Sequence, residues 1–145
     1  MTETPEILEG GCLCGAVRYR ITAPFRPVIA CHCRQCARWS GHVVAATAVA
    51  LTRFAYLSGD DDDVTWYAAS PHAERGFCGR CGSNLFWRET AADHLSIMAG
   101  TLDQPTGLML GANIYVADKS DYYQINDDLP AFEAGSAGDQ GLVKP

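Results

Sequence analysis

The chemistry of this sequence is concentrated in its cysteines, seven in all, which fall into three short clusters. The clusters comprise Cys12 and Cys14, then Cys31, Cys33 and Cys36, and lastly Cys78 and Cys81. C-x-C and C-x-x-C spacings let two sulfur atoms point at one ion, and thiolate sulfur is a preferred ligand of zinc. Because an odd number of thiols cannot all pair, metal binding is the favoured interpretation, with disulfides the alternative.

The two outer pairs form a natural set of four ligands. Residues 78–82, Cys-Gly-Arg-Cys-Gly, have the spacing of a zinc knuckle, in which glycine permits the backbone angles of a tight turn. Residues 11–15, Gly-Cys-Leu-Cys-Gly, share this glycine-flanked character. Structural zinc is held by four protein ligands, so we expect these two pairs to close one site that joins the start of the chain to its middle.

The central cluster is then one ligand short. Zinc held by Cys31, Cys33 and Cys36 would keep a position open for water or substrate, which is typical of catalytic zinc. Two alternatives stay open: another side chain such as His32 closes the set, or the protein has a single four-cysteine site and three remaining thiols. His32 lies between two ligands, so we expect it beside the site or at the surface, with ligation the alternative.

Other polar residues near or between the clusters carry weaker signals. Three arginines could offset thiolate charge, hold a carboxylate or be simply solvated, and three isolated histidines are interpreted as structural. These residues are Arg34, Arg38 and Arg80, and His42, His72 and His94. The run of four aspartates at 60–63 lacks the alternating spacing of a calcium loop and is expected to form a solvated turn.

Length and composition indicate one globular domain. Of 145 residues 48% are hydrophobic and 19% charged, so residues 1–134 are expected to form a single zinc-binding domain, with a flexible tail at 135–145. A net charge of -6 argues against general binding to nucleic acid or to an anionic membrane. The absence of a signal peptide and of a long apolar run predicts a cytoplasmic location, whereas the oligomeric state stays open.

The elements that position the cysteines are predicted to be short strands. The segment 16–21 alternates apolar and basic residues, as in a half-buried strand. The further segments that are expected to form strands are 42–51, 54–57, 64–69, 75–77, 85–88, 94–99 and 112–116. A helix is expected only in the turn or two after Cys33, and residues 1–10 as a lead-in. This pattern predicts a mainly β fold, either a sandwich or a folded-over sheet.

Four motifs together resemble a known family. They are Gly11–Gly15, Cys31–Arg38, Phe77–Ser83 and the closing Asp128–Phe132, in that order along the chain. The sequence over about residues 9–134 closely resembles the glutathione-dependent formaldehyde-activating enzyme family, also called the centromere-protein-V-like family. It departs from the usual family pattern at Asn113, where histidine is frequent, and at Tyr122–Tyr123, where tryptophan is common.

The resemblance implies a β-tent fold, a mostly antiparallel β structure with zinc knuckles. It further implies a carbon–sulfur lyase that joins formaldehyde to glutathione or a similar small thiol, giving the S-hydroxymethyl adduct. In the family pattern Cys12, Cys14, Cys78 and Cys81 match the structural zinc ligands, and Cys31, Cys33 and Cys36 match the ligands of a more labile catalytic zinc. The rival hypotheses are a non-enzymatic zinc module for interactions and a redox sensor whose central cysteines release zinc and form a disulfide.

Overall fold

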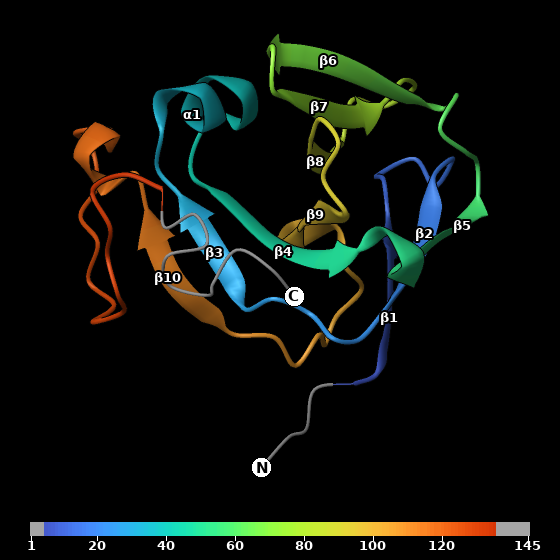
Figure 1. Cartoon of the computed structure of the whole chain (residues 1–145), viewed down its shortest axis with the longest axis horizontal. Coiled ribbons are helices and arrows are strands. Elements are labelled where there is room, and N and C mark those ends of the chain that lie inside the picture. The colour runs from blue at the N-terminus through green and yellow to red at the C-terminus, as the bar shows by residue number, and fades with distance from the viewer. Residues whose placement is uncertain (1–4, 136–145) are drawn as a thin grey trace.

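The computed structural model describes residues 5–135, which form two β-sheets, one α-helix and three 3-10 turns (Figure 1). The smaller sheet has the order β1-β2-β5, with β1 Ile7–Gly11, β2 Arg18–Thr22 and β5 Phe54–Ser58. The larger sheet has the order β10-β3-β4-β9-β8-β7-β6. Its strands are β3 Val28–Cys31, β4 Val44–Ala50, β6 Val64–Ser70, β7 Ala73–Cys78, β8 Asn84–Glu89, β9 His94–Met98 and β10 Leu110–Ile114. The helix is α1 Arg34–Ser40, and the turns are η1 Leu51–Arg53, η2 Ala99–Thr101 and η3 Val116–Asp118.

The predicted mainly β, β-tent fold is confirmed. Every pairing in the two sheets is antiparallel except that of β10 with β3. The predicted strands all occur, with ends shifted by no more than two residues, and the helix follows Cys33 as expected. The tail from 136 onward lies outside the described residues.

Two strands were missed. Residues 1–10 were interpreted as a lead-in, but β1 begins at Ile7 and pairs with β2 along its whole length. The two glycines of β1 explain why the sequence did not predict this strand, because glycine is depleted in strands. A side chain at Gly10 would clash, since its Cβ would lie 2.6 Å from the Tyr19 hydroxyl. The other missed strand, β3, has only four residues and ends in the cysteine cluster.

Alternation along the larger sheet gives it two different faces. One face packs on the smaller sheet in the main core, around the buried side chains of Tyr19, Phe86 and Ile97. The rings of Tyr19 and Phe86 meet edge to face at 5.4 Å. Residues of the opposite parity, such as Ile29, Ala46 and Met98, line a cavity instead. The larger sheet therefore separates the main hydrophobic core on one of its faces from the cavity on the other.

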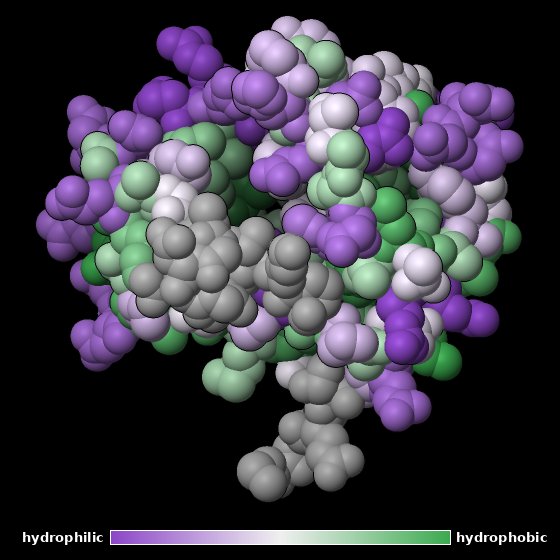
Figure 2. Space-filling model, viewed as in Figure 1, coloured by the Kyte–Doolittle hydropathy of each residue, from purple (hydrophilic) through white to green (hydrophobic). Residues whose placement is uncertain are grey.

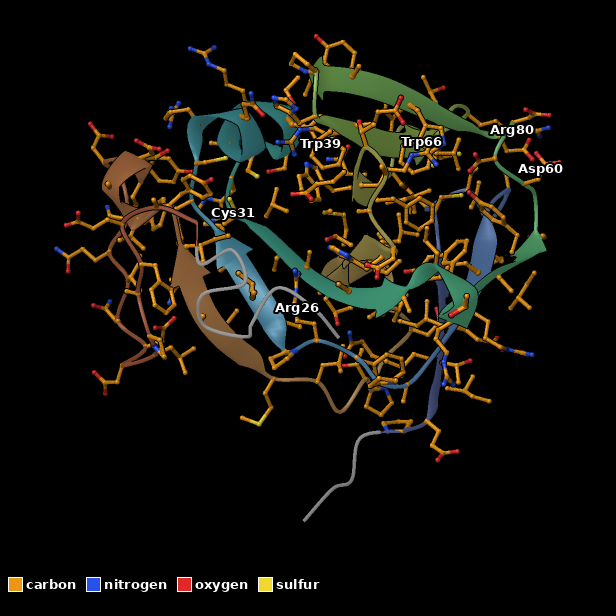
Figure 3. The ribbon with its side chains drawn as sticks, in the orientation of Figure 1. Arg26, Cys31, Trp39, Asp60, Trp66 and Arg80 are labelled. Atoms are coloured by element: carbon orange, nitrogen blue, oxygen red, sulfur yellow. The ribbon has the colours of Figure 1, made fainter. Side chains whose placement is uncertain are left out.

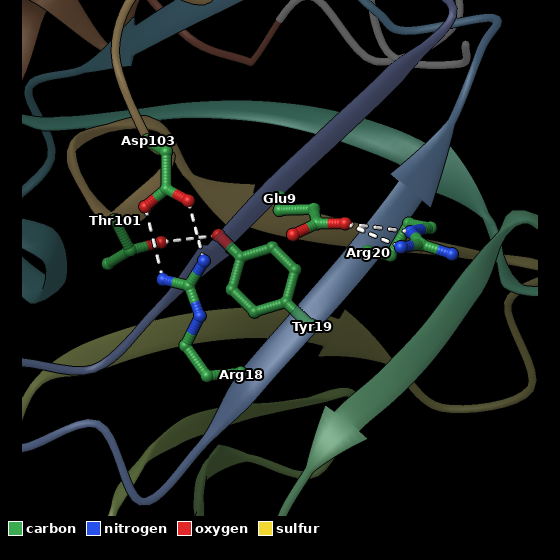
Figure 4. A network of polar contacts seen from close by, with 6 residues as sticks. All are labelled: Glu9, Arg18, Tyr19, Arg20, Thr101 and Asp103. Carbon is green, nitrogen blue, oxygen red and sulfur yellow. Dashed lines mark hydrogen bonds and ion pairs between the residues drawn. The ribbon is translucent and has the colours of Figure 1, made fainter.

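Polar contacts connect β2 to the segment after β9 (Figure 4). Arg18 of β2 donates two hydrogen bonds to Asp103, at 3.1 and 2.5 Å. The Tyr19 hydroxyl lies 2.6 Å from Thr101 Oγ1, and burial raises the pKa of this phenol. These contacts tie β2 to the segment after β9, so the two sheets are joined by polar bonds as well as by the core.

The chain around α1 is arranged so that one strand leads directly to the helix. Strand β3 lies between β10 and β4, and Cys33 then caps the helix by accepting a hydrogen bond from the backbone N–H of Cys36. Gly41 ends the helix in the left-handed conformation, with φ 89°. No helix among the described residues has the length and apolar character needed to cross a membrane.

Candidate metal centres and the adjoining cavity

The structure brings the two outer cysteine pairs together. Cys12 and Cys14 come from the turn between β1 and β2, and Cys78 and Cys81 from the turn between β7 and β8. Their four sulfur atoms lie within 4.8 Å of one another. Cys14 Sγ is 3.6 Å from Cys12 Sγ and 3.8 Å from Cys78 Sγ.

These separations fit one metal ion. Four sulfurs placed tetrahedrally at the zinc–sulfur distance of about 2.3 Å would be about 3.8 Å apart, whereas a disulfide would need about 2.05 Å. The glycine that ends each turn supports the geometry, because Gly15 and Gly82 have φ of 83° and 79°, where a Cβ is unfavourable. The set can therefore hold a tetrahedral metal between the two sheets.

Hydrogen-bond donors lie beside three of the four sulfur atoms. The backbone N–H groups of Val17 and Arg80 point at Cys12 Sγ and Cys78 Sγ, at 3.3 and 3.4 Å. The Ser83 hydroxyl and its backbone N–H lower the pKa of Cys81 to about 5. Since the thiolate is the form that binds metal, the lowered pKa prepares Cys81 as a ligand.

The three central cysteines also converge, from the end of β3 and the first turns of α1. Their sulfurs lie within 4.8 Å of one another. Hydrogen bonds from Cys31 and Cys36 lower the pKa of Cys33, and the same contacts raise the pKa of Cys31. Ionisation of one thiol thus disfavours ionisation of the next, because like charges repel at this distance. The set can be fully ionised only around a cation, which is the chemistry that a bound metal supplies.

His32 is beside this set and is not one of its ligands. The His32 ring is buried, with Nε2 2.8 Å from Asn113 Oδ1 and Nδ1 2.6 Å from the Tyr123 hydroxyl. Asn113 donates its amide N–H groups to the Asp127 carboxylate, which leaves Oδ1 to accept from His32. Nε2 of His32 therefore donates to Asn113 Oδ1, and Nδ1 faces the Tyr123 hydroxyl. Both ring nitrogens of His32 contact these partners, and its expected position beside the site is confirmed.

Arg75 is the basic residue of the site that sequence analysis missed. It is buried on β7, and two nitrogens of its guanidinium lie 3.8 Å from Cys36 Sγ. The same group lies 5.0 Å above the Trp39 ring and donates to Gln35 Oε1 at 3.3 Å. Arg34, Arg38 and Arg80, the arginines that the sequence suggested, are all exposed. Arg75 thus supplies buried positive charge opposite the sulfur set.

The three-cysteine set opens on a cavity of about 570 Å³. Its walls are built from α1, from the β6–β7 hairpin and from one face of the larger sheet, including Met98 and Trp87. Figure 2 shows the hollow with apolar side chains at depth. His72 and His94 also line it, although the sequence suggested only structural roles for them. A small organic molecule can therefore reach the central sulfurs.

Comparisons with known proteins identify the family of the chain. The sequence model for the glutathione-dependent formaldehyde-activating enzyme family matches residues 7–118. The chain belongs to this family. A putative glutathione-dependent formaldehyde-activating enzyme of Halomonas elongata is 30% identical over 139 residues, covering 82% of this chain and 81% of the relative.

The chain is also similar to a second curated protein and to a solved structure. An uncharacterized lyase of Schizosaccharomyces pombe is 28% identical over 125 residues, covering 86% of this chain and 89% of the relative. The crystal structure of a Rhodobacter sphaeroides protein superposes with a TM-score of 0.51 at 21% identity, covering 66% of this chain and 88% of that chain. The latter likeness concerns the fold alone.

Proposed function

We propose that the protein is a zinc-dependent carbon–sulfur lyase that joins formaldehyde to glutathione or a similar thiol. The observation that carries this function is the three-cysteine set open to a cavity, beside a complete four-cysteine set. An incomplete ligand set facing a cavity is typical of catalytic metal, and a closed one of structural metal. The names of the family and of the Halomonas elongata relative supply the substrates.

In this proposal the two sets have different roles. Cys12, Cys14, Cys78 and Cys81 hold a structural zinc, and Cys31, Cys33 and Cys36 hold the catalytic zinc. When bound at the second set, zinc supplies Lewis acidity that lowers the pKa of a thiol and polarises a carbonyl oxygen.

The residues of the chain perform the remaining tasks. The reaction forms one carbon–sulfur bond, breaks the carbonyl π bond, and moves the thiol proton to the former carbonyl oxygen. The cavity walls hold the two reactants together and limit the access of water. Arg75 balances the charge of the sulfur set, and His32 with its partners fixes the turn from β3 to α1. We place this chemistry in the cytoplasm, where thiols stay reduced.

The test measures metal content and turnover together. Wild-type protein should bind two zinc ions. It should also form S-hydroxymethylglutathione faster than the spontaneous reaction does, as measured by exchange NMR. Cys33→Ser should lose one zinc and the acceleration, while it stays folded. A wild-type protein that holds two zinc ions tightly and gives no acceleration would contradict the enzyme proposal and favour a zinc-binding module.

A further inference from the structure

Tyr115 follows the last strand of the larger sheet and has an unusual backbone conformation. It lies directly after β10, with φ 56° and ψ 39° in the left-handed region. A bulky residue is rare in this region, because its Cβ approaches the following carbonyl oxygen. The Tyr115 backbone N–H donates to the Ala134 carbonyl at 3.2 Å, and its carbonyl accepts from the Asp118 N–H at 3.1 Å. The surrounding chain therefore holds Tyr115 in this conformation.

The left-handed conformation brings the Tyr115 side chain to the cavity. Successive side chains of a strand point to opposite faces. Ile114, the last residue of β10, lines the cavity, so a continued strand would direct Tyr115 away from it. Tyr115 lines the cavity as well, because the chain turns at this residue. Strained backbone of this kind is commonly retained where it places a functional side chain.

Strand pairing places Tyr115 beside the three-cysteine set. Its neighbour Ile114 pairs with Cys31 in the parallel ladder of β10 and β3, and accepts a hydrogen bond from the His32 backbone N–H at 3.0 Å. Figure 3 shows Cys31 where β3 runs beside β10. Because neighbouring strands are about 4.8 Å apart, the chain reaches Tyr115 about one strand spacing from the first of the three central cysteines.

The Tyr115 hydroxyl is an available hydrogen-bond donor. Within the part of the chain that the structure describes, it has no hydrogen-bond partner. Burial raises the pKa of Tyr115, and the charges of the three central cysteines and of Asp118 raise it further. The hydroxyl therefore keeps its proton at neutral pH and lies within electrostatic reach of the sulfur set. The residue is 37% exposed, which places it at the edge of the cavity, where a small aldehyde can enter.

We propose that Tyr115 is a catalytic residue that donates a hydrogen bond to the aldehyde oxygen while the thiol adds to the carbon. This inference rests on the proposed function. As the carbon–sulfur bond forms, the π electron pair of the carbonyl moves to the oxygen, which takes the thiol proton and becomes a hydroxyl. A donor that is fixed before the reaction stabilises the charge developing on this oxygen. Tyr115 keeps its own proton, so the same contact holds the hydroxyl of the product.

Binding of the product tests this contact without turnover. S-ethylglutathione has the shape of S-hydroxymethylglutathione but carries a methyl group in place of the hydroxyl. Calorimetry with the zinc-loaded protein would compare the two ligands in one formaldehyde buffer, in which glutathione is present as the S-hydroxymethyl adduct. Wild type should prefer the adduct roughly 3- to 10-fold, and Tyr115→Phe should bind both ligands equally. Tyr67→Phe is the matched control and should keep the preference, because Tyr67 is exposed and lies outside the lining.

Turnover gives an independent measure of the same hydroxyl. Tyr115→Phe should lower kcat for adduct formation at least about 10-fold, while zinc content, stability to urea and KM for glutathione stay close to those of wild type. Equal affinity of wild type for the two ligands, a preference that survives in Tyr115→Phe, or unchanged turnover of this variant would overturn the assignment. A wild type that prefers the adduct through Tyr115 but does not accelerate its formation would support the hydroxyl contact and contradict the lyase activity.

Discussion

Single residues around the three-cysteine set balance its charge and fix its shape. Arg75 contacts Cys36 Sγ from a strand distant in sequence, and His32 is held by Asn113 and Tyr123. None of these residues is a metal ligand in our proposal, yet each restrains the cysteines. Groups outside a ligand set commonly change metal affinity by 10- to 100-fold.

Replacing Arg75 should loosen metal at the three-cysteine set selectively. Arg75→Met keeps an unbranched, largely apolar side chain but removes the guanidinium and its charge beside Cys36 Sγ. We expect zinc to leave this set at a chelator concentration roughly 10- to 100-fold lower than in wild type, since hydrogen bonds to charged groups contribute about 1.5–3 kcal/mol. Chelator titration monitored by a zinc dye measures this, and Arg80→Met, beside the other set, should leave that release phase unchanged.

Replacing Asn113 should destabilise the fold. Asn113→Leu leaves the buried Nε2–H of His32 and the Asp127 carboxylate without their partner. The free energy of unfolding should fall by about 1–3 kcal/mol, measured by urea denaturation. The exposed Asn126 serves as the control, because Asn126→Leu should change stability by no more than about 0.5 kcal/mol. Equal effects of the two substitutions would contradict a role for the His32 contacts.

At the scale of elements, the sequence predicts most strands and both cysteine sets, and fails where no local signal exists. The sequence locates β4 and β9 but cannot say which of their faces lines a cavity. For that reason the sequence analysis did not single out Arg26 or Arg75, whose burial depends on pairings between distant strands. The ligand sets were predictable because four sulfurs at knuckle spacing leave few combinations that satisfy one metal.

The contact between β2 and the segment after β9 gives the fold a pH-dependent component. The Arg18 guanidinium holds the pKa of Asp103 below its usual range. A carboxyl whose folded pKa is depressed contributes stability above its unfolded pKa, near 4, and the contribution is lost as pH falls through the folded value. Because both side chains are partly exposed, at 34% and 54%, we expect less than about 1 kcal/mol.

Asp103→Asn tests this contribution. The variant should unfold more easily than wild type at pH 7, and the difference should shrink as pH falls below about 4. Urea denaturation between pH 2.5 and 7 measures it. A difference that stays constant across this range would show that Asp103 acts through shape rather than charge.

At the scale of the whole molecule, the four-cysteine set joins the two sheets. Cys12 and Cys14 belong to the β1–β2 turn of the smaller sheet, and Cys78 and Cys81 to the β7–β8 turn of the larger. Metal here would cross-link residues far apart in sequence, whereas the three-cysteine set uses one local segment. Removal of the two metals should therefore have unequal consequences.

Zinc should leave in two phases, with the three-cysteine set releasing first because it has fewer ligands. Cys78→Ser should lower the free energy of unfolding by about 3 kcal/mol or more, and Cys33→Ser by much less, because metal binding is coupled to folding at the cross-linking set. Release curves and urea denaturation measure both effects. A single phase of release would argue against two distinct sites.

The parallel pairing of β10 with β3 sets an order for biosynthesis. All four outer cysteines have left the ribosome once residue 81 is exposed, so the first metal can bind while synthesis continues. His32, by contrast, obtains its partners Asn113 and Tyr123 only when the last strand and the segment after it emerge. The three central cysteines thus acquire their final surroundings last, after the segments that carry the four outer cysteines have emerged.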